Sequence, residues 1–188
     1  MHSRAGFLVA SSMILLAGCV IEPGGNGNRN GNGNANSNGN ANSNVNDNSA
    51  AEPDFRAVLS GENEVSDTPV ETDATGEATF TLSADGMTLS YTLTVNDGVG
   101  LTAAHIHLGG PTENGGIVAS LFGLEDPGVE SDGQLTTGAI VSTALVGELA
   151  SMTLSELLDE IEAGNAYVNV HSEANPGGEI RGQIEAVE

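Results

Sequence analysis

The chain has 188 residues, of which four are Lys or Arg and 26 are Asp or Glu, so its formal net charge at pH 7 is -22. This length fits one domain with extensions. A charge this negative is repelled by phosphate backbones and by anionic lipid surfaces, which argues against nucleic-acid binding. The one cysteine, Cys19, cannot form an intramolecular disulfide. An apolar core or a metal must therefore hold the fold together.

The first 18 residues have the pattern of a bacterial lipoprotein signal peptide. A short basic start ending at Arg4 precedes an apolar run over residues 6–17. This run is shorter than the roughly 20 residues that a membrane-spanning helix needs. Residues 16–19, Leu-Ala-Gly-Cys, resemble the lipobox, in which signal peptidase cuts before a cysteine whose thiol then carries diacylglycerol. We predict that residues 1–18 are removed, and that lipidated Cys19 anchors the protein at the periplasmic side or surface of the cell envelope. A plain secretory signal is the alternative.

Residues 19–51 are predicted to form a disordered, Asn- and Gly-rich tether. From residue 26 to residue 48 every second residue is asparagine. Neither face of such a strand would be apolar, so burial could not offset the loss of conformational entropy. A Gly-rich coil of about 30 residues reaches roughly 30 Å, which clears the lipid headgroups. The alternative is that the asparagine ladder associates in a cross-β manner.

From residue 52 to residue 188 the composition is that of a folded domain, in which short runs of alternating apolar and hydroxyl residues predict β-strands. Such runs lie at 55–59, 78–82, 87–95, 104–108, 117–122, 138–145, 166–171 and 179–185. A turn signal at 84–86 joins the second and third runs into a hairpin. We therefore expect an all-β, antiparallel β-sandwich.

One segment departs from this pattern and predicts a short helix over residues 153–164. Its aliphatic residues have helical spacing: Leu154, Leu157, Leu158 and Ile161. Thr153 and Glu156 form a capping box, and Gly164 is placed to end the helix. We expect this helix to cap one end of the sandwich.

Three histidines carry the main chemical signal. His105 and His107 lie two residues apart on a predicted strand and so share one face. On the predicted strand at 166–171, His171 shares a face with Tyr167 and Asn169. If these strands were neighbours, three imidazoles could converge into a copper or zinc site that leaves coordination positions open to water. The alternative is that the histidines and Asn169 form a hydrogen-bonded polar cluster that fixes the strand register.

Four sequence blocks resemble the CHRD domain, which is named after chordin and is common in bacterial secreted proteins. They lie at 104–107, 110–118, 164–172 and 175–184, within a resemblance that runs from about residue 55 to residue 185. Two positions depart from the family pattern, Leu108 and Ser172. The resemblance implies an immunoglobulin-like β-sandwich that serves as an extracellular module. The molecular activity of the family is poorly defined.

A more distant likeness is to copper/zinc superoxide dismutase, another sandwich with a His-x-His strand. Three histidines cannot supply the two metal sites of that enzyme, so we expect no dismutase activity. No Ser-His-Asp or Cys-His motif is present either, and we predict a protein that is not an enzyme and has no catalytic residues.

Two charged residues of the last predicted strand, Glu179 and Arg181, are interpreted as structural, as is Asn169. A lone arginine in so acidic a domain is expected to pair with a local carboxylate or to cap carbonyl groups. The acidic loop at 125–132 offers oxygen ligands for Ca²⁺, although it lacks the regular spacing of a calcium loop.

These observations predict a lipid-anchored extracytoplasmic binding or structural module. Its expected partners are the membrane, through the lipid, and an unidentified protein or surface polymer, and the sequence by itself fixes no cofactor. The alternative is a periplasmic or surface metal-handling or redox protein that binds copper or zinc through His105, His107 and His171.

Overall fold

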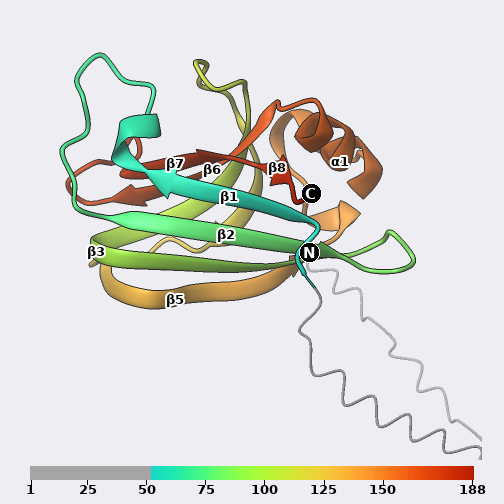
Figure 1. Cartoon of the computed structure of the whole chain (residues 1–188), viewed down its shortest axis with the longest axis horizontal. Helices are drawn as coiled ribbons and strands as arrows, with labels where there is room; N and C mark the ends of the chain where they lie inside the picture. Colours follow the sequence, from blue (N-terminus) through green and yellow to red (C-terminus); the bar gives the residue numbers. More distant parts are fainter. Residues whose placement is uncertain (1–51) are drawn as a thin grey trace, which may run out of the picture. The chain divides into compact units, whose positions relative to one another are not determined.

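The computed structural model describes residues 52–188, and the predicted signal peptide and tether lie outside the described residues. Residues 52–188 form an antiparallel β-sandwich with one α-helix (Figure 1). This confirms the all-β class and the sandwich that the alternating pattern predicted. In this part of the chain, no helix combines the length and the apolar character that crossing a bilayer requires.

The order of elements follows the prediction with two main differences, and the strand predicted at 179–185 is divided into two short strands at 180–183 and 185–186. The elements are β1 (Phe55–Ser60), β2 (Thr75–Leu82), β3 (Leu89–Leu108), β4 (Ile117–Phe122), β5 (Val129–Ile140), α1 (Leu154–Glu162), β6 (Ala166–Ser172), β7 (Ile180–Gln183) and β8 (Glu185–Ala186). The first difference is that β3 joins two predicted strands into one of 20 residues. It passes through Asp97 and Gly100, which both have positive φ, and its pairing with β5 shifts register in this region.

The second difference is β5, which was predicted at 138–145 and lies at Val129–Ile140. The predicted boundaries are wrong because most of β5 has no apolar face: its residues alternate between exposed and half-buried, and only Ile140 is buried. The strand pairs with β3 alone among the described strands. The end of the predicted strand instead forms a 3-10 turn, η2 (Ser142–Ala144).

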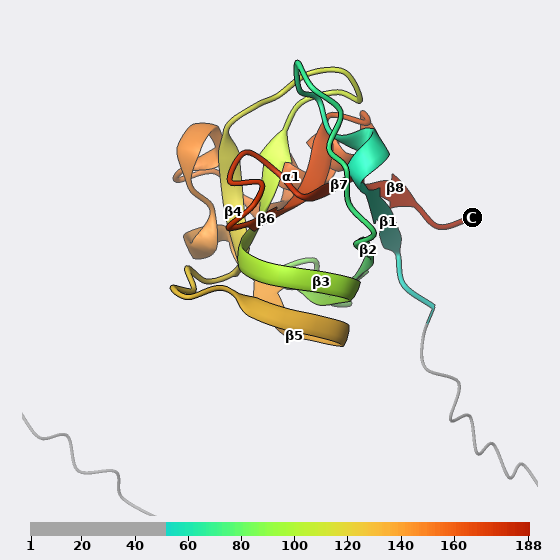
Figure 2. The ribbon, with the colours of Figure 1, turned by 90° about the vertical axis from the view of Figure 1, so that its left-hand side faces the viewer.

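The long strand β3 connects the two layers of the sandwich. Its first half pairs with β2 and β5, and its second half pairs with β4 and β6. On the other side, β1 pairs with both β2 and β7, and β7 pairs with β6. Because β2 and β6 both pair with β3, the order of hydrogen-bonded strands closes on itself. Figure 2 shows β3 crossing above β5 and then curving towards β4 and β6.

The core lies between the layers and is mainly aliphatic. Fully buried side chains come from most strands, for example Phe80, Leu93, Ile106, Val168 and Ile180. The predicted helix and its capping box are confirmed, and α1 buries its apolar side against the core at one end of the sandwich (Figure 1). With alternate residues of β3 and β6 committed to the core, their other residues are left to form a polar face.

Candidate metal centre

The candidate site lies on the polar face where β3 and β6 run side by side. The two strands are antiparallel neighbours, with His105 opposite Asn169 and His107 opposite Tyr167. His171 lies opposite Ala103, two positions further along β6 than Asn169. The sequence prediction depended on this adjacency, and the structure brings the three predicted histidines together.

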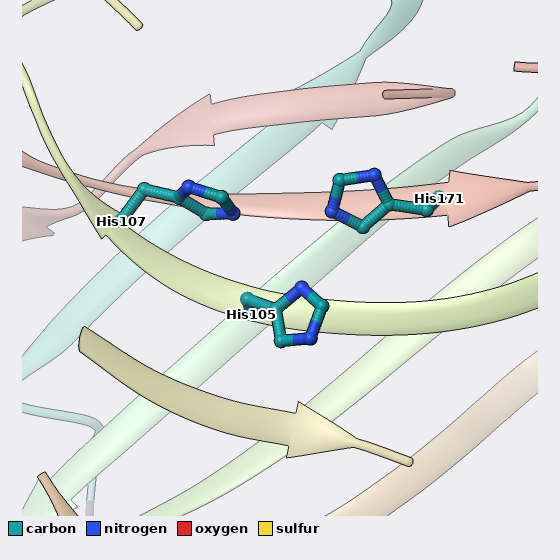
Figure 3. Close-up of side chains that lie close together, drawn as sticks. All are labelled: His105, His107 and His171. Atoms are coloured by element: carbon teal, nitrogen blue, oxygen red, sulfur yellow. The ribbon is translucent and has the colours of Figure 1, made fainter. Parts of the chain in front are cut away.

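We call His105, His107 and His171 the histidine trio. The ring centres of His105 and His171 lie 5.2 Å apart, those of His105 and His107 5.8 Å, and those of His107 and His171 6.0 Å. Each side chain offers one ligand atom that lies within 4.8 Å of the other two. Figure 3 shows the rings turned towards a common point.

Two main-chain carbonyl groups orient two of the rings. The Nδ1–H of His107 donates to the Gly115 oxygen at 3.0 Å, and the Nδ1–H of His171 donates to the Pro176 oxygen at 3.0 Å. A carbonyl oxygen only accepts hydrogen bonds, so both rings carry a proton on Nδ1 and a lone pair on Nε2. Metal-ligating histidines are commonly oriented in this way.

The nitrogens that remain have no hydrogen-bond partner. His105 Nδ1, His107 Nε2 and His171 Nε2 are all buried and unpaired. Buried polar atoms nearly always have a partner, so three such atoms in one cluster require an explanation. The hydrogen-bonded alternative does not describe this site, because the Asn169 side chain donates to Glu64 Oε1 at 2.5 Å and to the Ile180 carbonyl. A bound metal ion would satisfy all three nitrogens.

Burial keeps the trio neutral. It lowers the pKa of His105 to about 4, an effect to which the neighbouring His171 and His107 add. Burial also lowers the pKa of His107 and of His171, although their hydrogen bonds to Gly115 and Pro176 act in the opposite direction. Neutral imidazole is the form that binds a metal, so the site does not have to lose protons at neutral pH before it binds one.

His107 is held further by Tyr167, which sequence reasoning did not assign to the site. The Tyr167 ring stacks on the His107 ring with centres 5.0 Å apart and planes 13° from parallel. The Gly115 N–H donates to the Tyr167 hydroxyl at 3.2 Å, while the Gly115 carbonyl accepts from His107. Gly115 was missed as well, because its role depends on where the β3–β4 loop places its backbone.

Arg181 takes the carbonyl-capping role that was one of its two expected roles. It is only 1% exposed and donates to the carbonyl oxygens of Gly110 at 2.7 Å and Glu113 at 2.9 Å. It also donates to Asn114 Oδ1 at 3.0 Å. Its guanidinium carbon lies 3.5 Å from the centre of the Tyr167 ring. Arg181 therefore ties the β3–β4 loop to the strands behind the trio.

Glu179 fixes a different loop and does not pair with Arg181. It is 6% exposed and accepts hydrogen bonds from Thr72, Ser172 and Asn175. Burial on its own would raise the pKa of Glu179, but these hydrogen bonds hold it below its ordinary value. Glu179 is thus a charged structural residue that anchors the turn between β6 and β7.

Glu64 is a second carboxylate near this face that the sequence did not single out. It accepts the hydrogen bond from Asn169, and burial raises the pKa of Glu64 to about 7. The hydrogen bond from Asn169 and the charge of Arg181 lower this pKa, whereas the charge of Glu179 raises it. Glu64 therefore exchanges a proton near neutral pH.

Within residues 52–188 the trio is the one group of three or more side chains whose ligand atoms converge as a metal site requires. The acidic residues of loop 125–132 form no such group, so the calcium hypothesis gains no support from the structure. Cys19, the predicted lipidation site, lies outside the described residues.

Fold and site together define a small β-sandwich module with a histidine cluster on one sheet face. Residues 55–184 match the CHRD domain, and the chain belongs to the CHRD family, as the sequence blocks indicated. No curated protein and no solved structure is similar enough to the chain to be matched. Family membership is typical of an extracellular binding or structural module and assigns no ligand to it.

Proposed function

We propose that this protein is a lipid-anchored, extracytoplasmic binding module that holds one copper or zinc ion in the histidine trio. The observation that carries the proposal is the convergence of three buried nitrogens without hydrogen-bond partners. The CHRD domain supports an extracellular binding role, and the residues at 1–19 support secretion and lipid attachment.

The donor set suits these two metals. Imidazole nitrogen is a good ligand for both copper and zinc. Zinc–nitrogen bonds of about 2.0–2.1 Å in a tetrahedral site require nitrogens roughly 3.4 Å apart. Since the ligand atoms of the trio already lie within 4.8 Å of one another, small side-chain rotations are enough to close the site. Three protein ligands leave a coordination position open to water or to a ligand from outside.

We expect one equivalent of Cu²⁺ or Zn²⁺ to bind with sub-micromolar Kd, because the three ligands are already neutral and hydrogen bonds already orient two of them. The protein to titrate is the mature chain from residue 19 with Cys19→Ser, since this removes its one thiol. His107→Ala and His171→Ala should each weaken binding at least 100-fold by removing a ligand. Isothermal titration calorimetry measures the stoichiometry and the Kd for the unsubstituted chain and for each variant.

Asp159→Asn is the matched control, because Asp159 is an exposed carboxylate on α1 and its substitution tests whether surface carboxylates bind the metal. It should leave Kd unchanged. If the unsubstituted chain binds no metal, or if the histidine variants bind as tightly as it does, the metal role is refuted. The protein would then be a metal-free module that engages a protein or a surface polymer.

The anchor is tested separately in a bacterial host fed a labelled fatty acid. We expect the wild-type protein to sediment with membranes and to carry the label, because diacylglycerol and further acyl chains on Cys19 insert into the bilayer. Cys19→Ser should carry no label. An unlabelled wild-type protein released into the soluble fraction would instead support the plain secretory signal.

A further inference from the structure

The trio supplies no negative charge to a bound ion. All three ligands are neutral imidazoles, and no carboxylate or thiolate among residues 52–188 joins the cluster. A divalent ion in such a site would keep both of its charges unless it brought an anion with it. A monovalent ion would keep only one.

A positive charge is buried next to the trio. The Arg181 guanidinium lies over the Tyr167 ring. The Tyr167 ring in turn stacks on the ring of His107, a member of the trio. The hydrogen-bond acceptors of Arg181 are two main-chain carbonyls and the Asn114 side chain, all of them uncharged. In the described part of the chain, the one ion pair joins Arg56 and Glu77, so Arg181 is buried without a direct ion pair, and Glu64 is the carboxylate whose charge acts on it.

From this arrangement we propose that the trio selects copper as Cu⁺ over Zn²⁺ and Cu²⁺, because its donor set is neutral, and that Arg181 strengthens the preference. The inference rests on the proposed function, since it specifies which ion the same site takes. The repulsion between an ion and Arg181 grows in proportion to the charge of the ion. The cost of removing an ion from water grows faster than its charge, so a partly buried neutral site favours the monovalent ion. Three neutral nitrogens complete a trigonal Cu⁺ site without an anion.

The test compares three ions on the mature chain carrying Cys19→Ser. Cu⁺ is delivered anaerobically with a reductant and measured against a colorimetric Cu⁺ chelator, and Zn²⁺ and Cu²⁺ are measured against their own chelating indicators at pH 7.5. We expect the Kd for Cu⁺ to be at least tenfold below the Kd for either divalent ion. Tighter binding of Zn²⁺ or Cu²⁺ would overturn the Cu⁺ proposal and leave the metal-binding function intact. Absence of binding by all three ions would overturn the function itself.

Arg181→Gln tests the contribution of Arg181 to the preference. Removing one positive charge should tighten Cu⁺ binding roughly threefold and divalent binding roughly tenfold, because the logarithm of the effect is proportional to ion charge. Arg56→Gln is the matched control, since Arg56 is exposed and paired with Glu77, and it should change neither Kd. Equal effects of Arg181→Gln on Cu⁺ and Zn²⁺ would refute the role of Arg181. If that variant does not fold, the comparison of the three ions on the unsubstituted site still decides the proposal.

Discussion

Gly115→Ala is expected to lower the free energy of unfolding by about 3 kcal/mol, at the upper end of what a forced steric overlap costs. A Cβ atom on residue 115 would lie 1.4 Å from the Leu108 carbonyl oxygen, a distance that no rotamer change relieves. The backbone of the β3–β4 loop would have to move away from β3. Urea unfolding followed by circular dichroism measures the loss as a lower midpoint.

The same substitution should weaken metal binding about 10–100-fold, the usual cost of removing a group that orients a ligand. Both backbone groups of Gly115 serve the site, because its carbonyl accepts from His107 and its N–H donates to Tyr167. Moving the loop therefore releases the His107 ring from both restraints. Calorimetric titration of the folded variant gives the change in Kd.

Gly116→Ala is the control next to it in the chain. A Cβ atom at residue 116 would have no neighbour closer than 3.8 Å, and that neighbour is the end of the flexible Glu148 side chain. We expect its unfolding free energy to stay within about 0.5 kcal/mol of wild type, as at most surface positions. A Gly115→Ala protein as stable as Gly116→Ala, with wild-type metal affinity, would show that the loop does not position His107.

The residues show why part of this site is predictable from sequence. Alternation along a strand places His105 and His107 on one face and His171 on the face of Tyr167 and Asn169, and this needs no knowledge of the fold. That the two strands are neighbours was a hypothesis, because strand order depends on contacts between distant segments. The resemblance to the CHRD domain predicted a sandwich but did not provide the pairing of β3 with β6.

The parts that sequence reasoning missed are set by loop backbone. The main-chain carbonyls of Gly115 and Pro176 determine which nitrogen of His107 and His171 is free. Every residue has a main-chain carbonyl, so the sequence does not show which one will accept from a histidine. Glu64 lies far from the trio in the chain and reaches the site face only through Asn169. β5 was misplaced for a related reason, since an edge strand without an apolar face gives no alternation to detect.

Metal binding is expected to raise the stability of the protein strongly at neutral pH. A ligand that binds only the folded state adds about 4 kcal/mol when its free concentration is roughly 1,000 times Kd. At about 4 °C for each kcal/mol in a domain of this size, Tm should rise by roughly 16 °C. Differential scanning calorimetry with and without metal measures the rise, and a roughly 100-fold weaker binding in His171→Ala should reduce it to about 6 °C or less.

The pH dependence of this effect follows from the low pKa values of the trio. In the unfolded chain a histidine titrates near 6.5, whereas folded His105 titrates near pH 4, so protons bind preferentially to the unfolded state between these values. The contribution of His105 to stability is therefore fully present above pH 6.5 and is lost as pH falls towards 4, and the lowered pKa values of His107 and His171 act in the same direction. Protons also begin to compete with the metal only in this acidic range, so the rise in Tm should persist at pH 6 and disappear by about pH 4.

Glu64 changes the stability with pH in the opposite direction, so its effect must be measured separately from that of the histidines. Its pKa rises from 4.5 to about 7 on folding, so its contribution to stability is present below pH 4.5 and is lost as pH rises through 7. We therefore expect metal-free Glu64→Gln to lose more stability on acidification from pH 7 to pH 4 than the wild type does, and His105→Gln to lose less. Exposed histidines become protonated near pH 6.5, and only desolvated rings resist protonation to lower pH. If the metal-induced rise in Tm were lost near pH 6.5, this would therefore contradict the burial of the trio.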